Sequence, residues 1–120
     1  RVLNRLSDAI GTYPNAFGYL ASQLDFALGQ PHEIALVGDP QAEDMRALLD
    51  VIRKEFRPNQ VVAMRKTDEA DPARLIPLLE DRRQLDGAAT AYVCHNYVCR
   101  LPVTSADALR QELEIDLRQN

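Results

Sequence analysis

The stretch LDGAATAYVCHNYVCRLP, residues 85–102, decides the fold, because it predicts a β-hairpin. Two runs of β-branched and aromatic residues flank a short polar connection, which is the pattern of two strands joined by a tight turn. With a two-residue loop at Asn96 and Tyr97, Cys94 lies opposite Cys99 on the neighbouring strand. The two cysteines then form a non-hydrogen-bonded pair with Cα atoms about 4.5 Å apart, and a disulfide can bridge that distance.

Cys94 and Cys99 have two interpretations. We expect two reduced, half-buried thiols that behave as small hydrophobic side chains, because free cysteine is among the most buried residue types. The alternative is a redox pair, in which a disulfide opens and closes. A bridge across so short a loop removes little entropy from the unfolded chain, so it would serve as a labile switch more than as a structural staple.

No metal site is expected at the hairpin, although His95 stands beside Cys94. Neighbouring residues on a strand point to opposite faces of the sheet, so these two side chains do not converge on one ion. A fourth zinc ligand is also missing, since His32 is the only other histidine and no further cysteine exists. The sequence predicts neither a metal nor a cofactor.

Alternating strand and helix patterns precede and follow the hairpin. The run 34–37 predicts a strand covered on both faces. Asp39 is expected to cap a helix that starts at Pro40 and reaches about Phe56. A second strand at 61–64 is expected to lie parallel to the first, through a right-handed crossover. The buried stripe of the helix is predicted to be Met45, Leu48, Leu49, Ile52 and Phe56.

The remaining elements complete a seven-element order. A short, irregular helix is expected from Pro72, with Leu75, Ile76, Leu78 and Leu79 available to the core. The hairpin strands are expected at 90–94 and 98–101, and Ser105 is expected to cap the last helix. The inward face of that helix is predicted to carry Ala108, Leu109, Leu113 and Leu117.

This order predicts the fold class: α/β, a thioredoxin-like β-α-β-α-β-β-α sandwich with a mixed four-stranded sheet, preceded by a helical hairpin. The predicted domains are the helical hairpin at 1–30 and the α/β domain at 31–120. Aromatic residues in the first segment are interpreted as packing surface, since they recur at helical spacing. If the hairpin has lost neighbouring chain, we expect the fragment to self-associate as a homo-oligomer.

Length and charge narrow the function classes. The 120 residues carry 46% hydrophobic residues and a net charge of −4, so a packed core is expected and nucleic-acid binding is not. No apolar run approaches the roughly 18 residues of a membrane span, and no signal-peptide pattern is present. We therefore expect a cytoplasmic location with no membrane partner. Because the chain begins with Arg1, we expect it to be part of a longer protein.

The residues at the position of the usual thioredoxin active site include no cysteine. In thioredoxin-type proteins a Cys-x-x-Cys follows the first strand, where helix amides lower the thiol pKa. The matching residues here are 38–41, Gly-Asp-Pro-Gln, with Asp39 at the helix start. The cis-proline that such proteins place before the third strand corresponds to 88–90, Ala-Ala-Thr. Ordinary dithiol exchange is not expected there.

The segments 85–87, 90–94 and 102–104, together with Cys99, resemble the closing part of a large family of thioredoxin-domain-containing proteins. Its mammalian members are called spermatogenesis-associated protein. The resemblance covers about residues 30–115 and implies a three-part protein: a thioredoxin-like domain, a six-hairpin helical barrel similar to glycosidases and sugar epimerases, and a C-terminal α/β segment.

The resemblance implies a non-catalytic C-terminal module that packs against the helical barrel of the same polypeptide, with no assigned biochemical activity. Two alternatives remain: a redox-active module that uses Cys94 and Cys99, and an accessory part of a sugar-processing barrel. No catalytic residue is predicted, and the fragment alone is not expected to be an enzyme. Arg82 and Arg83 are expected to form surface pairs with neighbouring carboxylates.

Overall fold

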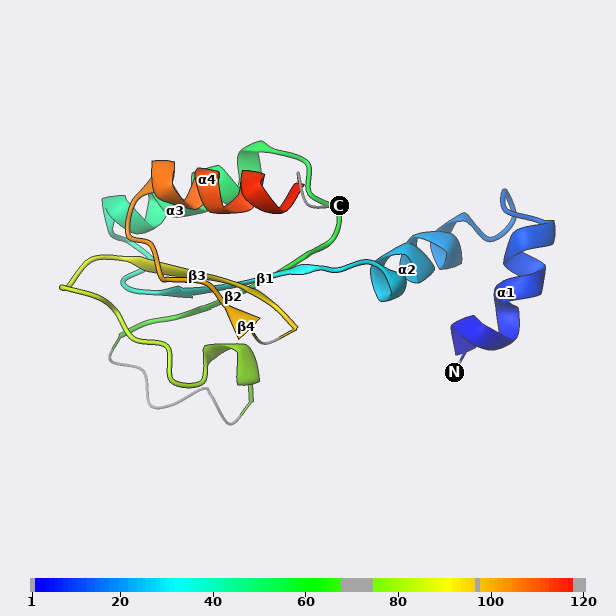
Figure 1. Ribbon diagram of the computed structural model, residues 1–120, viewed down its shortest axis with the longest axis horizontal. Helices are drawn as coiled ribbons and strands as arrows, with labels where there is room; N and C mark the ends of the chain where they lie inside the picture. The colour runs from blue at the N-terminus through cyan, green and yellow to red at the C-terminus, as the bar shows by residue number, and fades with distance from the viewer. Residues whose placement is uncertain (1, 68–74, 97, 118–120) are drawn as a thin grey trace. The chain divides into compact units, whose positions relative to one another are not determined.

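The computed structural model describes residues 2–67, 75–96 and 98–117 (Figure 1). The chain divides into two compact units, Arg1–Pro31 and His32–Asn120. The first unit contains helices α1 (Val2–Thr12) and α2 (Gly18–Leu28). Among the described residues, no helix is both long enough and apolar enough to span a bilayer.

The first unit buries little of its apolar surface by itself. Ile10 of α1 is buried, but α2 has no buried residue, and Tyr19 and Leu28 are 79% and 77% exposed. Helix α2 begins at Gly18, and Phe17 lies at its N-cap position. Self-association of this unit stays a prediction.

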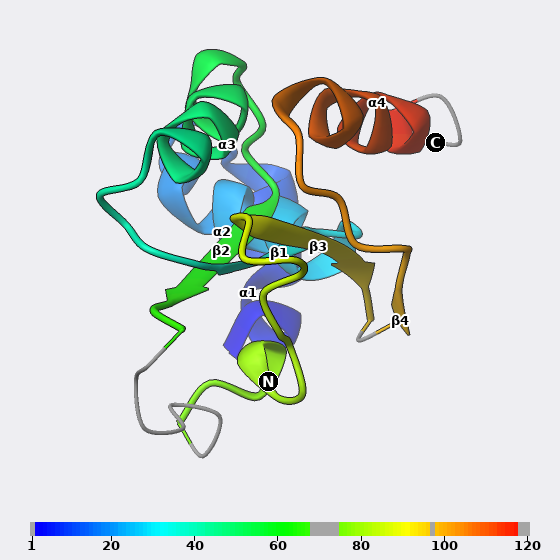
Figure 2. The same cartoon turned by 90° about the vertical axis from the view of Figure 1, so that its left-hand side faces the viewer.

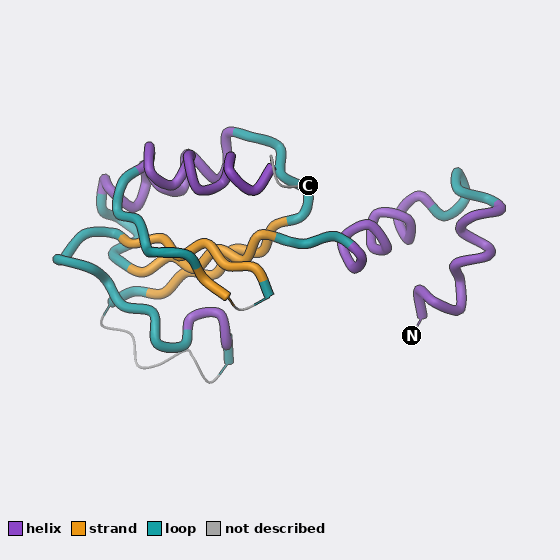
Figure 3. Tube along the Cα trace, in the orientation of Figure 1, coloured by secondary structure: helices purple, strands orange, loops and turns teal. Residues whose placement is uncertain are grey.

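The second unit is an α/β sandwich built on one sheet (Figures 1 and 3). Its strands lie in the order β2-β1-β3-β4; β1 pairs parallel with β2 and antiparallel with β3, and β3 pairs antiparallel with β4. The elements are β1 (His32–Val37), α3 (Glu43–Lys54), β2 (Gln60–Arg65), the 3-10 helix η2 (Pro77–Leu79), β3 (Thr90–His95), β4 (Val98–Cys99) and α4 (Ala106–Leu117). The predicted fold class is confirmed, since this mixed four-stranded α/β arrangement is consistent with a thioredoxin-like fold.

Helices α3 and α4 cover one face of the sheet, and η2 lies on the opposite face (Figures 1 and 2). Alternation along β1 divides its side chains between these layers, because successive strand residues point to opposite faces. Ile34 and Leu36 pack with α3 and α4, whereas Ala35 and Val37 pack with Leu79 of η2. The prediction that this strand is covered on both faces is confirmed.

Helix α3 begins later and ends earlier than predicted. Asp39 does not cap it: its carboxylate accepts the Gln41 N–H at 2.9 Å, and its carbonyl accepts the Ala42 N–H at 3.1 Å. These two bonds close a turn, so helical geometry starts only at Glu43. The helix ends at Lys54, which leaves Phe56 outside the helix and 92% exposed, so its predicted burial is wrong.

Other boundaries also differ. Leu75 is 86% exposed instead of buried, and the described helical part of its segment is only η2; the predicted start at Pro72 lies outside the described residues. Strand β4 ends at Cys99, two residues earlier than expected. In α4, Leu109 and Leu113 are fully buried as predicted, and the Ser105 hydroxyl accepts the Ala108 N–H at 3.3 Å. The side chain of Leu117 lies outside the described part.

Candidate functional site

The structure brings together the two segments that form the reactive site in thioredoxin-type proteins. Gly38 follows β1, and a Cβ atom at this position would lie 3.1 Å from the Ala89 Cα. Its φ of +152° is also a backbone conformation that favours glycine. Gly38 therefore allows these two segments to approach closely. The side chains beside them are those of Asp39 and Ala89, and neither has a nucleophilic sulfur.

A polar surface hollow lies at Asp39, in the segment that follows β1. It is lined by Asp39, Lys66, Thr67 and Gln84. Thr67 and Gln84 hydrogen bond through their side chains across this hollow. Its charged groups have opposite signs, and none of the four is a thiol. The hollow therefore offers hydrogen bonds to a polar group but no dithiol chemistry.

Both cysteines of the chain lie in the hairpin, where Cys94 and Cys99 are joined by a disulfide with an S–S distance of 1.96 Å. The predicted register is confirmed, because Cys94 pairs with Cys99 across β3 and β4. The Arg100 N–H donates to the Val93 carbonyl at 3.0 Å, which makes the cysteines a non-hydrogen-bonded pair. Their Cα atoms are 3.9 Å apart. The expectation of two reduced thiols is therefore wrong for this structure: the narrow pair brings the sulfurs within bonding distance.

This disulfide and the thioredoxin-type position lie at opposite ends of the sheet. Val37, at the end of β1, pairs with Thr90, whereas Glu33, near its start, pairs with Cys94. The two pairs are four positions apart along β1, which corresponds to about 13 Å. The disulfide is consequently not a displaced copy of the usual Cys-x-x-Cys, which would begin a helix after β1.

Arg82 lies beside this disulfide, although a surface ion pair was expected for it. Its Nη2 atom lies 2.8 Å from the Cys99 Sγ, and its guanidinium carbon lies 5.2 Å from the centre of the Tyr92 ring. The hydroxyl of Tyr92 donates to the Arg83 carbonyl at 2.7 Å, which ties this segment to β3. Arg82 therefore extends across β3 toward a sulfur, and it forms no ion pair with the acidic residues that the structure describes. A local charge pattern does not reveal a contact between residues 17 positions apart.

His95, the third residue considered for a metal site, has its ring centre 5.0 Å from that of His32. His32 is buried at the start of β1, so the two imidazoles lie on neighbouring strands. In residues 2–67, 75–96 and 98–117, no group of three His, Cys, Asp or Glu side chains has the arrangement of a metal site. The disulfide and Arg82 are thus the chemically distinctive groups of the hairpin.

Reduction of the disulfide should lower the free energy of unfolding by only about 2 kcal/mol, because the bond closes a loop of a few residues. Urea unfolding of the chain with and without dithiothreitol, followed by near-ultraviolet circular dichroism, measures this difference. The variant in which Cys94 and Cys99 are both alanine is the control, since its unfolding should not respond to the reductant. Complete unfolding of the α/β unit on reduction would contradict the small effect.

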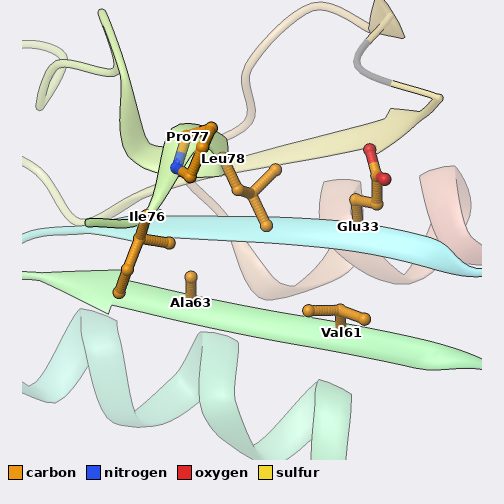
Figure 4. A pocket seen from close by; sticks show the side chains of 6 residues that line it. All are labelled: Glu33, Val61, Ala63, Ile76, Pro77 and Leu78. Carbon is orange, nitrogen blue, oxygen red and sulfur yellow. The ribbon is translucent and has the colours of Figure 1, made fainter. Parts of the chain in front are cut away.

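A second feature is an apolar pocket of about 170 Å³ between the edge strand β2 and η2 (Figure 4). The side chains of Val61 and Ala63 on β2 and those of Ile76 and Leu78 beside them line it, together with Pro77 and Glu33. Val61, Val62 and Met64 are 40–42% exposed, which is high for apolar residues in a strand. Within the described residues 2–67, 75–96 and 98–117, β2 is an edge strand of the sheet, and it combines this edge with exposed apolar side chains.

Comparisons with known proteins identify relatives of much greater length. The chain is 31% identical over 113 residues to human spermatogenesis-associated protein 20, and 29% identical to the rat and mouse proteins of the same name. Each alignment covers 93% of this chain but only 14% of the relative. No protein-family model matches the chain, and no solved structure matches it. The sequence is therefore homologous to the C-terminal part of spermatogenesis-associated protein 20, and it is similar to a module of a larger, multidomain protein.

Proposed function

We propose that this chain is a non-catalytic docking module that packs, through the β2 edge, on the helical-barrel part of the longer polypeptide to which it belongs. The observation that carries the proposal is the exposed apolar edge of β2 beside its pocket. An open strand edge is a surface that proteins normally cover or charge, because it pairs readily with other chain. The β2 strand carries no such protection at three positions: Val61, Val62 and Met64 are apolar and remain 40–42% exposed.

The length of the relatives supports an occupant within the same polypeptide. In spermatogenesis-associated protein 20 the matched residues are 14% of the length, so most of the polypeptide lies outside the region that this chain matches. A surface formed by a strand edge and an apolar hollow suits an intramolecular partner, since the two parts are linked at high effective concentration. The lack of a thiol at Asp39 and Ala89 supports a role other than thioredoxin chemistry.

Hydrogen exchange tests this surface directly. In the isolated 120-residue chain, the amides of β2 that face away from β1 should exchange rapidly, because they lie on the sheet edge. In the full-length protein the same amides should be protected by at least about tenfold, since docking would bury them. Equal exchange of β2 in both proteins would overturn the proposal. Protection that depends on the concentration of the isolated chain would instead identify a second copy as the occupant, which also contradicts it.

A pair of valine substitutions provides the matched comparison. Val61→Lys places a charge on the β2 edge, and Val98→Lys places the same charge on β4 at the other edge, where Val98 is 76% exposed. Only Val61→Lys should increase proteolytic release of the module from the full-length protein. Thermal unfolding of both isolated variants should stay close to that of the parent chain, because both side chains are solvent-accessible.

A further inference from the structure

We propose that Cys94 and Cys99 form a reversible thiol–disulfide switch, in which Cys99 exchanges with small thiol compounds and Arg82 stabilises its thiolate. This function is independent of docking through β2, because the hairpin lies at the other edge of the sheet. Three features carry it: the different burial of the two cysteines, the guanidinium on one sulfur, and the short loop that the bond closes.

Burial distinguishes the two sulfurs. Cys94 is 0% exposed and packs in the apolar cluster with Ala35, Leu79 and Tyr92 on the η2 face of the sheet. Cys99 lies on the edge strand β4 and is only partly buried. A thiolate from solution must reach a sulfur atom to break the bond, so accessibility selects the atom that is attacked. Here that atom is the Cys99 Sγ.

Charge also distinguishes the two sulfurs, because it decides which of them carries the anion after the bond opens. The Arg82 Nη2 lies 2.8 Å from the Cys99 Sγ, and a guanidinium keeps its charge throughout the pH range of thiol chemistry. A neighbouring cation favours the thiolate over the thiol. The next residue, Arg100, is directed to α4, where its Nη1 lies 3.3 Å from a Glu112 carboxylate oxygen. In the reduced state, Arg82 therefore stabilises the thiolate of Cys99.

Two thiol molecules supply the electrons for opening. The thiolate of the first attacks the Cys99 Sγ, a mixed disulfide forms, and the Cys94 sulfur leaves as a thiolate that takes a proton from water. The thiolate of the second attacks the outer sulfur of the mixed disulfide and releases the Cys99 thiolate beside Arg82. The two small thiols become one disulfide, and the protein cystine gains two electrons. The reverse sequence closes the bond.

Glutathione is the probe for the first test. The parent chain and its Arg82→Gln variant are equilibrated in buffers with different ratios of reduced to oxidised glutathione, and free thiols are counted by mass after alkylation. We expect the parent disulfide to open reversibly and the Arg82→Gln disulfide to require about tenfold more reducing conditions. Arg83→Gln, the neighbouring control, should behave as the parent. Identical titrations of the parent and Arg82→Gln, or no opening of the parent, would overturn the proposal.

Single-cysteine variants test which sulfur reacts. Cys99 in the Cys94→Ser variant should be alkylated by iodoacetamide at pH 7 at least about tenfold faster than Cys94 in the Cys99→Ser variant. Adding Arg82→Gln should slow Cys99 and move its rate profile to higher pH, which a merely structural role for Arg82 would not do. Equal rates, or a faster Cys94, would refute the assignment. If a serine variant does not fold, the glutathione titration still tests the proposal, because the proteins used in it retain both cysteines.

Discussion

Replacing Leu48 with alanine should lower the free energy of unfolding of the α/β unit by about 2–5 kcal/mol. Leu48 is fully buried on α3 and packs in the cluster that joins the sheet to α3 and α4. Truncation removes apolar contacts and leaves a cavity, because the cluster is formed by four elements, β1, β3, α3 and α4, and relaxes only partly around the lost atoms. A loss of this size is a large fraction of the total stability of a small domain.

Phe56→Ala is the control for Leu48→Ala, since it removes a larger side chain two residues beyond the same helix. Phe56 is 92% exposed, so its loss should change the unfolding free energy by no more than about 0.5 kcal/mol. Amide hydrogen exchange in β1 and β3 measures both effects within the α/β unit, apart from α1 and α2. A cost of several kcal/mol for Phe56→Ala would show that this ring is covered in the isolated chain.

The second large effect is expected for Asp44→Ala. One carboxylate oxygen of Asp44 accepts the Met45 N–H at 2.8 Å, and the other accepts the Ala89 N–H at 2.7 Å. The second bond joins the start of α3 to the residue that precedes β3, 45 positions later in the chain. Ala89 is 1% exposed, so its N–H would lose its partner in a place that water does not reach readily. We expect a loss of about 1.5–3 kcal/mol, as for a hydrogen bond to a charged group.

Two variants separate this bond from the general effect of an acidic residue at a helix start. Glu43→Ala removes an exposed carboxylate from the same first turn of α3, and its cost should stay below about 1 kcal/mol. Asp44→Asn retains an acceptor and should recover part of the loss. Urea unfolding of the three variants gives the comparison. Equal destabilisation by Glu43→Ala and Asp44→Ala would mean that the bond to Ala89 contributes nothing of its own.

Local patterns in the sequence predicted the sheet and the hairpin correctly. The apolar run 34–37 lies within β1, and the spacing of the two cysteines set the pairing of Cys94 with Cys99. Both depend on interactions over a few residues: strand alternation and the geometry of a two-residue loop. Helix limits were less accurate, because the turn that Asp39 closes competes with a helical cap and delays α3 to Glu43.

The sequence by itself determined a mixed α/β fold, the register of its hairpin and the absence of sulfur from residues 38–41. Only the tertiary structure decided that Arg82 contacts the Cys99 sulfur, that Asp44 holds Ala89, and that β2 presents an apolar edge. The physical reason is the range of the interactions. Periodicity and turn chemistry act between near neighbours, whereas these contacts depend on how distant segments pack over the two faces of the sheet.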